Sequence, residues 1–526
     1  MISVEFAQKL EAENAALRFE NSALRADVME LNSKLTWLME QLSVNNNKMF
    51  GVSSEKNMNS QIGLFEDKHR EVELIAEKPP KPKVERPKKE SELSTKLPKA
   101  LPIETIEVKL PEGEQICPDC GGALHDIGSE VVRREVKLVP AKAEIREFNR
   151  HSYSCRNCEK AADDKSVPIV KAQMPSQLIK GAICAPETVA HIIVEKFVMG
   201  SPLYRQEQAW NRLGIMFNRQ TMANWLIRVS TDYLEPIYDE LHRKLLLHKF
   251  LHGDGTVFQV LDEPGKSPQS QSHMWVYRTS GDAKHPIILY EYQPDKTKER
   301  PRDFLDGFVG YLMTDGEAAY HSLSESIIVV GCVSHVRRKF VDALKAIKNK
   351  KDRVGSNAQI GVDYCDELFR IEREMEVDSF EERYEIRNKA SKSVLENFHK
   401  WLVSVQPYIA PKSAIGKAVN YALNQWKYIE RYLLDGCIEI SNNRCERSVK
   451  PFVINRKNFL FAQSVAGANA AAVLQSLTET AKENGLNPFE YFSYVFRTAA
   501  GHNLRVNPDM ISALLPENVP QVCRVK

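Results

Sequence analysis

The sequence predicts a multidomain α/β protein. Three observations carry this prediction: a heptad repeat near the N-terminus, two Cys-x-x-Cys motifs, and a change from helical to strand periodicity in the second half. The chain has 526 residues, which exceeds the size of one hydrophobic core. About three to four folded units are therefore expected along the chain.

The N-terminal segment carries a seven-residue repeat of leucine. The repeat comprises Leu10, Leu17, Leu24, Leu31 and Leu38. Asn14 and Asn21 occupy positions three residues before leucines of the repeat, where a polar residue sets helix register and partner number. Residues 1–48 are thus predicted to form a leucine-zipper coiled coil through which the chain self-associates. A single amphipathic helix packed on its own protein is the alternative.

Charge is balanced over the whole chain, with 72 Lys and Arg against 70 Asp and Glu, so any nucleic-acid surface must be local. Residues 49–105 are expected to form a basic linker rich in Pro and Lys, which either contacts DNA phosphates or is merely solvated. No run of apolar residues has the length of a membrane span, and the N-terminus lacks the pattern of a secretion signal. The expected location is cytoplasmic.

Four of the ten cysteines form two close pairs, and the segments between the pairs resemble strands. The four are Cys117, Cys120, Cys155 and Cys158. Two such pairs, joined by a hairpin, are typical of a four-cysteine zinc ribbon, predicted here for residues 106–175. Four thiolates leave no open coordination position, so the one Zn²⁺ would be structural. A redox motif or a coincidence of free thiols is the alternative.

Residues 176–247 have helical periodicity and are predicted to form a helix-turn-helix-like DNA-binding region. Gly214 marks the turn and Asn218 is a candidate helix cap. Three side chains beyond this cap could face a groove of DNA: Arg219, Gln220 and Asn224. Helical hairpins are also common scaffolding, so a purely structural role remains open.

Short β-rich runs begin near Lys249, and a helical segment lies between the third and the fourth run. Three antiparallel strands, a helix, and then further strands and helices is the order of a ribonuclease H-like core. We predict this core for residues 248–485, with an α-helical insertion at about 341–435, and a C-terminal segment at 486–526. The helix that ends near Gly485 is expected to pack on the core.

Three acidic residues stand in settings suited to metal binding. Asp254 lies on the first strand between two glycines, which are expected to leave space around it, and His252 falls on the same face. Asp315 ends the fourth strand, and Glu446 lies near a helix start with Asn442 or Asn443 as its cap. Taken singly, an Asp-Gly turn or a Glu in a first helical turn is more often structural.

Several segments together resemble the large transposase of the insertion-sequence family numbered sixty-six. They are LHGDGTVFQVL, YLMTDGEAAY, VSHVRRKF, SNNRCERSVKPFVINRKNFLF and AVLQSLTETAKENGLNPFEYF, behind a heptad helix and CPDCGG. The resemblance covers nearly the whole chain. Its most specific motif is NNRCER followed by RKNFLF.

This resemblance implies a DDE catalytic triad of Asp254, Asp315 and Glu446, each a ligand of Mg²⁺ or Mn²⁺, with two ions per active site. Two such ions can activate a nucleophile and stabilise the leaving oxygen in phosphodiester chemistry. The implied activity is DNA cleavage and strand transfer at the terminal inverted repeats of the element and at target DNA. Two small accessory proteins are implied as partners. The chain departs from the family at Gly255, where an acidic residue is usual.

Basic residues near these motifs are candidates for phosphate contacts. They are Arg337, Arg338, Lys339, Arg447, Lys450, Arg456 and Lys457. A solvated helix face is the alternative for each of them. His335 could orient a phosphate or a water, or be a hydrogen-bonded structural residue.

Two other functions compete with this interpretation. His335 and Arg338 form an H-x-x-R pair like that of tyrosine recombinases, which need no metal and become covalently attached to DNA. A non-catalytic dimeric regulator could combine a zipper, a zinc ribbon and a helix-turn-helix. The large β-rich second half argues against such a regulator, which would not need it.

Overall fold

The computed structural model describes residues 143–154, 169–377 and 379–525. The described residues from Gln173 to Val525 form one compact unit, and those before Gln173 belong to a second unit. In the second unit, β1 (Ser152–Ser154) and β2 (Ile169–Lys171) pair antiparallel. Within the described ranges, no helix is long and apolar enough to cross a membrane.

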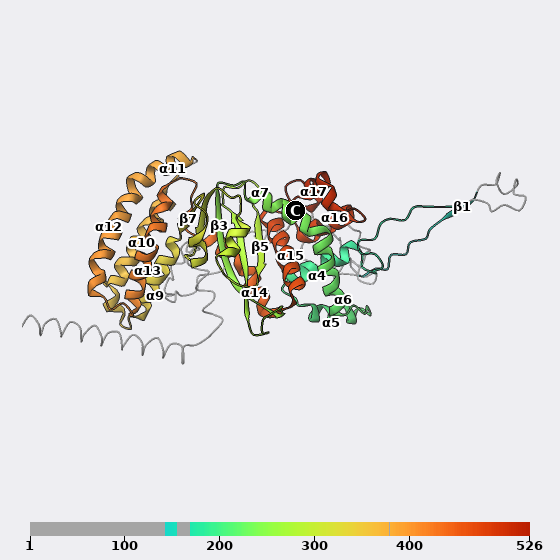
Figure 1. Ribbon diagram of the computed structural model, residues 1–526, viewed down its shortest axis with the longest axis horizontal. Helices are drawn as coiled ribbons and strands as arrows, with labels where there is room; N and C mark the ends of the chain where they lie inside the picture. The colour runs from blue at the N-terminus through green and yellow to red at the C-terminus, as the bar shows by residue number, and fades with distance from the viewer. Residues whose placement is uncertain (1–142, 155–168, 378, 526) are drawn as a thin grey trace, which may run out of the picture. The chain divides into compact units, whose positions relative to one another are not determined.

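A mixed sheet forms the centre of the larger unit (Figure 1). Its strands are β3 (Phe250–Asp262), β4 (Gln271–Thr279), β5 (Ile288–Gln293), β6 (Gly310–Thr314), β7 (Ile327–Gly331) and β8 (Ala462–Ser464). The order is β5-β4-β3-β6-β7, in which β3, β4 and β5 are antiparallel while β6 and β7 run parallel to β3. The short β8 pairs with the far end of β3. Strands β3 to β7 and α8 (Glu299–Phe304) lie in the segments predicted from the sequence, whereas β8 was not predicted.

The helices that precede the sheet in the chain and those at the C-terminal end of the unit pack in one hydrophobic core against the sheet. They are α4 (Pro186–Phe197), α5 (Leu203–Arg212), α6 (Arg219–Val229), α7 (Glu235–Leu245), α15 (Val465–Glu483), α16 (Pro488–Ala499) and α17 (Pro508–Leu514). Tyr277, Leu289 and Leu477 are fully buried in this core. The core therefore joins the helical region before the sheet to the C-terminal helices.

The helix α15 covers the open edge of the sheet at β5. Thr480 Oγ1 accepts from the Ile288 amide at 3.0 Å, and Ser476 Oγ accepts from the Tyr290 amide at 2.7 Å. An edge strand exposes unpaired backbone groups, and these hydroxyls satisfy two of them. The expectation that this helix packs on the core is confirmed, and it ends before Gly485, as expected.

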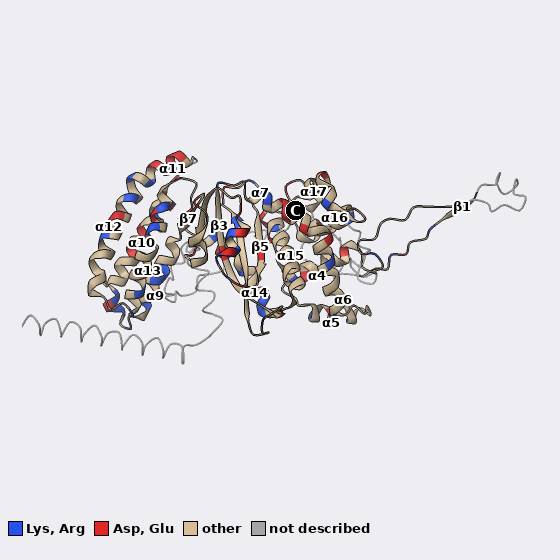
Figure 2. Ribbon diagram, in the orientation of Figure 1, with Lys and Arg blue, Asp and Glu red and all other residues tan. Residues whose placement is uncertain are grey.

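Between β7 and α14 (Asn443–Phe459), the chain forms a group of helices. They are α9 (Val333–Ala346), α10 (Asn357–Glu374), α11 (Phe380–Ile386), α12 (Lys392–Val405) and α13 (Ala414–Ile429). These helices enclose a second core around Phe340, Leu368 and Phe398. Figure 2 shows acidic and basic residues interspersed along them. The predicted insertion is thus helical, and its predicted first residue, 341, falls inside α9.

Candidate active site

Two of the candidate carboxylates lie on neighbouring parallel strands. Asp254 lies within β3, and Asp315 directly follows β6. The register pairs His252 of β3 with Met313 of β6. Because each strand advances equally per residue, Asp254 and Asp315 stand level two residues further on. Gly316 then turns the chain with φ +91°, a conformation that suits glycine.

The third candidate, Glu446, lies in the first turn of α14. This helix packs on the face of the sheet that carries Asp254, where Phe452 contacts Phe258 with ring centroids 5.1 Å apart. Arg338 of α9 donates from Nη2 to both carboxylate oxygens of Glu446, at 3.1 and 2.9 Å. The structure therefore brings helix α9 to the same place as the carboxylates.

The three carboxylates interact electrostatically. Burial raises the pKa of Asp254 to about 7, and the negative charges of Asp315 and Glu446 contribute to the increase. Opposing these effects, the Gly255 amide donates to Asp254 Oδ1 at 2.7 Å, and Arg338 is positively charged. Three carboxylates that repel one another in a partly buried site would be stabilised by a bound cation.

The donor chemistry fits a hard divalent cation, because carboxylate oxygens are the ligands that Mg²⁺ prefers. Within the described ranges, however, no three acidic, histidine or cysteine side chains converge closely enough to hold an ion as they stand. Glu446 has both oxygens on Arg338. Metal binding by Glu446 would compete with this ion pair.

The two glycines beside Asp254 do not leave open space, contrary to expectation. A Cβ at Gly253 would lie 3.0 Å from Tyr320 Oη, and a Cβ at Gly255 would lie 2.3 Å from His273 Nε2. Both glycines face away from Asp254, since side chains alternate along a strand. An acidic residue at position 255 would therefore have to displace His273, whose ring fills that space.

The predicted cap of α14 is confirmed in position at Asn442, but the cap residue does not make the side-chain hydrogen bond expected of a cap. Asn442 Nδ2 donates instead to the Gly253 carbonyl at 2.9 Å, and Oδ1 lies 2.9 Å from His252 Nδ1. The sequence pattern of a cap does not distinguish these partners, because they lie about 190 residues earlier in the chain.

His335 lies beside the carboxylates, with Nε2 3.6 Å from Glu446 Oε1 and 3.3 Å from Arg338 Nη1. Burial lowers the pKa of His335. The H-x-x-R pair of the sequence thus converges on Glu446.

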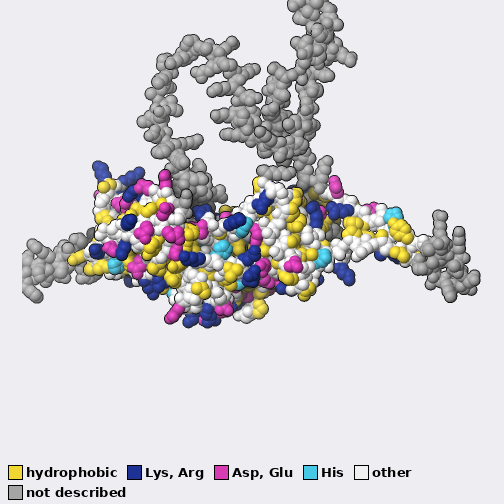
Figure 3. Space-filling view, turned by 90° about the horizontal axis from the view of Figure 1, so that it is seen from above, with side chains coloured by type: hydrophobic (Ala, Val, Ile, Leu, Met, Phe, Trp, Pro, Cys, Tyr) yellow, Lys and Arg dark blue, Asp and Glu magenta, His cyan; other side chains and the backbone are white. Residues whose placement is uncertain are grey.

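Other candidate basic residues differ in their surroundings. Arg337 pairs with Asp366 at 3.2 Å, and Lys339 Nζ lies 5.4 Å from the centre of the Tyr421 ring. Arg456 donates to Thr256 Oγ1 at 3.3 Å, two residues along β3 from Asp254. The remaining three are exposed on α14: Arg447, Lys450 and Lys457. On the face in Figure 3, acidic and basic side chains are intermixed, in keeping with the overall charge balance.

The helix-turn-helix candidate has the expected local structure. Helices α5 and α6 flank a turn at Gly214, which has φ +77°, and Asn218 Oδ1 accepts from the Thr221 amide at 2.8 Å. The three side chains predicted to contact DNA are exposed on α6, with Arg219 and Gln220 in its first turn and Asn224 near its middle. Two of them contact each other, since Gln220 Nε2 donates to Asn224 Oδ1 at 3.2 Å.

The predicted zipper at 1–48, the linker at 49–105 and the four zinc-ligand candidates lie outside the described residues. Those candidates are Cys117, Cys120, Cys155 and Cys158. The strand β1 ends at Ser154, directly before the second cysteine pair, and Ser154 pairs with Ile169 in the hairpin.

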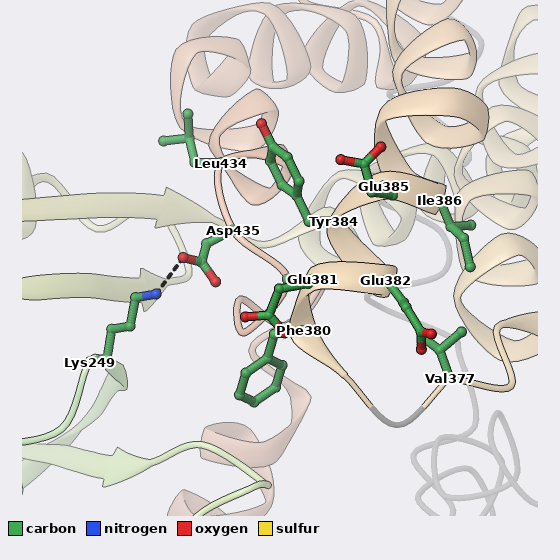
Figure 4. A pocket seen from close by; sticks show the side chains of 11 residues that line it. Lys249, Val377, Phe380, Glu381, Glu382, Tyr384, Glu385, Ile386, Leu434 and Asp435 are labelled. Carbon is green, nitrogen blue, oxygen red and sulfur yellow. Dashed lines mark hydrogen bonds and ion pairs between the residues drawn. The ribbon is translucent and has the colours of Figure 1, made fainter.

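A cavity of about 710 Å³ lies apart from the candidate carboxylates (Figure 4). Its lining includes Lys249 and Asp435, which form an ion pair at 2.5 Å, and acidic residues of α11. None of the residues predicted to bind metal or DNA lines it.

Comparisons with known proteins place this chain beside transposases. The family described as "Transposase IS66 family" matches residues 181–470, and its "C-terminal element" matches residues 476–516. The "zinc-finger binding domain of transposase IS66" matches residues 114–159, which include both cysteine pairs. This match indicates a zinc-binding domain.

Curated proteins of Sinorhizobium fredii are similar to the chain over most of its length. The chain is 31% identical to "uncharacterized protein y4jD" over 80% of its own length and 81% of the relative's. It is 29% identical to "uncharacterized protein y4qI" over 79% of its own length and 75% of the relative's.

Proposed function

Because this chain belongs to the IS66 family of transposases, which implies DNA binding and DNA transposition, we propose that it cleaves the ends of an insertion sequence and joins them to target DNA in a metal-dependent reaction. Asp254, Asp315 and Glu446 are the proposed metal ligands. The observation that carries this proposal is the placement of the three carboxylates: Asp254 and Asp315 stand level on neighbouring parallel strands, and Glu446 lies in the first turn of the helix packed on the same face.

The sheet supports a ribonuclease H-like core for this reaction. Three antiparallel strands are followed by two strands parallel to the first, in the order expected from the sequence. Ligands bind at the carboxyl ends of strands in open α/β sheets, and Asp315 occupies such an end. The helix α14 then supplies Glu446 from the face above.

Divalent ions bound by these carboxylates would activate a water or a DNA hydroxyl and stabilise the leaving oxygen. Arg338 has two roles in this proposal. It neutralises Glu446 in the free protein and exchanges this carboxylate for a DNA phosphate when the ion and the DNA end bind, since guanidinium suits both groups. Arg456 lies along the same strand face and is a further proposed phosphate contact.

The tyrosine-recombinase alternative finds less support. Burial raises the pKa of Tyr320 well above its usual value, and it also raises the pKa of Tyr421. The Tyr421 hydroxyl is engaged in a 2.8 Å bond to the Asp315 carbonyl. A tyrosine nucleophile must ionise as it attacks, so these two residues beside the carboxylates are poor candidates.

A chelation experiment distinguishes these reactions. We expect cleavage of the element's end DNA in Mg²⁺ or Mn²⁺ to stop when EDTA is added and to return when the ion is restored in excess. The DNA products should migrate identically before and after protease treatment. Products that are protein-linked and form in EDTA would favour the tyrosine reaction, and DNA binding without cleavage in either ion, with the accessory proteins supplied, would favour the regulator.

We also propose that residues 1–48 mediate self-association, because a heptad stripe buries its leucines only against a partner helix. Deleting residues 1–44 should lower the molar mass in solution, measured by light scattering. An unchanged mass would contradict the coiled coil. The two accessory proteins are proposed partners, and omitting them from the cleavage assay tests whether they are required.

A further inference from the structure

Asn442 forms hydrogen bonds to the two chain segments that carry Asp254 and Glu446 of the proposed triad. Its backbone carbonyl accepts from the Glu446 amide at 3.1 Å. Its side-chain amide donates to the carbonyl of Gly253, the residue before Asp254, at 2.9 Å. The Asn442 side chain is fully buried. One residue thus contacts the peptide of Glu446 and the peptide next to Asp254.

The hydrogen bonds determine the orientation of this amide. The Gly253 carbonyl can only accept, so Nδ2 of Asn442 must face it, and Oδ1 is left to face His252. His252 Nδ1 must then carry a proton and donate to Asn442 Oδ1 at 2.9 Å. On the other side of the ring, His252 Nε2 is buried without a hydrogen-bond partner among the described residues, and Glu439 Oε2 lies 3.7 Å away.

A buried polar network is a costly way to attach a helix to a sheet, because polar groups lose their water and an apolar side chain would pack as well. Hydrogen bonds differ from apolar contacts in being directional. They define how far α14 is shifted along β3, and hence where Glu446 stands relative to Asp254. Metal ligands tolerate errors of only about 0.5 Å in placement.

We propose that Asn442 is a positioning residue that sets Glu446 relative to Asp254 for metal binding, and that His252 orients the Asn442 amide. This inference rests on the function proposed above. It concerns Asn442 and His252, which are not metal ligands in that proposal. They act by holding the backbone next to Asp254 and at Glu446.

The test uses paired substitutions in the full-length protein. Asn442→Asp keeps the shape and the acceptor for His252 but places a carboxylate oxygen against the Gly253 carbonyl, whereas Asn442→Leu removes both bonds. His252→Asn keeps an amide donor near the position of Nδ1, and His252→Leu removes it. The matched control is Asn455→Leu, because Asn455 is buried on the same helix and makes one bond of 2.7 Å, to the Phe197 carbonyl of α4.

Three quantities are measured for each variant: the melting temperature, Mn²⁺ binding to the protein on uncut end DNA by loss of the free-ion electron paramagnetic resonance signal, and the Mn²⁺ concentration for half-maximal cleavage. Residues behind metal ligands typically change metal affinity about 10- to 100-fold. We expect losses in this range for both Asn442 variants and for His252→Leu, with His252→Asn close to wild type. Asn455→Leu should lower the melting temperature without changing Mn²⁺ binding.

The inference is overturned if the Asn442 variants melt earlier but bind Mn²⁺ as the wild type does, since the residue then only stabilises the fold. If Asn442→Leu does not fold, the two His252 variants decide the matter. Equal Mn²⁺ affinities of His252→Asn and His252→Leu would refute the orienting role. A wild-type affinity in His252→Asn together with a loss in His252→Leu would support it. A wild-type protein that neither binds Mn²⁺ nor cleaves DNA would instead overturn the proposed function, and this inference with it.

Discussion

Asp254→Asn, Asp315→Asn and Glu446→Gln should each lower cleavage and strand transfer by about a thousandfold or more. Bound metal ions contribute several kcal/mol to the transition state of phosphoryl transfer, and about 4 kcal/mol corresponds to a factor of about a thousand. An amide has nearly the shape of a carboxylate but lacks its charge, so the fold should persist. In Glu446→Gln, the new carbonyl oxygen can still accept from Arg338.

Combining two of these substitutions should cost little more than one, because the ligands act as a unit. Binding of end DNA should persist or strengthen, since removing negative charge eases the approach of phosphates. The measurements are a band-shift assay and a cleavage assay on the element's own ends.

Three aspartates of the same region provide controls: Asp262, Asp282 and Asp306. Asp262 accepts from Gln463 Nε2 at 2.7 Å near the far end of β3, and Asp282 accepts from Ser280 in a loop. Their amide variants should stay active. If any amide variant of the triad cuts and joins at the wild-type rate, that residue is not a ligand and the catalytic proposal fails.

Cys120→Ser should release one zinc ion per chain and loosen residues near 106–170. Metal binding and folding are coupled in small zinc modules, where the ion contributes about 10 kcal/mol or more. The described hairpin of β1 and β2 has three residues in each strand, all exposed, and an isolated two-stranded hairpin is marginally stable in water. We therefore expect the ordering of this hairpin to depend on the zinc site.

The catalytic half should remain folded in Cys120→Ser, because its cores draw on residues after Gln177 alone. Elemental analysis measures the zinc, and limited proteolysis locates the loosened segment. Cys184→Ser is the matched control, since Cys184 is a free buried thiol outside the two pairs, and it should retain the ion. Intact, freshly purified wild-type protein without zinc would refute the site.

Local pattern predicted much of the catalytic half correctly. Strand alternation and turn residues marked β3 to β7, and Asn218 caps α6 as expected. These features depend on residues within a few positions of one another, so a single sequence contains the information. The level placement of Asp254 and Asp315 was not predicted, because it depends on the pairing register of β3 with β6, which only the folded sheet defines.

The sequence by itself determined the residue types and their places along the elements: carboxylates on β3, after β6 and on α14, and basic residues on α9 and α14. Tertiary structure alone decided their partners. Arg337 pairs with Asp366 and Arg338 with Glu446, and the Asn442 side chain bonds to β3 instead of to the first turn of its own helix. The physical reason is that helix and strand periodicity define a face, whereas a hydrogen bond or an ion pair requires particular atoms within about 3 Å of each other. Only the packing of separate segments creates that proximity, with partners from 29 residues apart for Arg337 and Asp366 to 189 residues apart for Asn442 and Gly253.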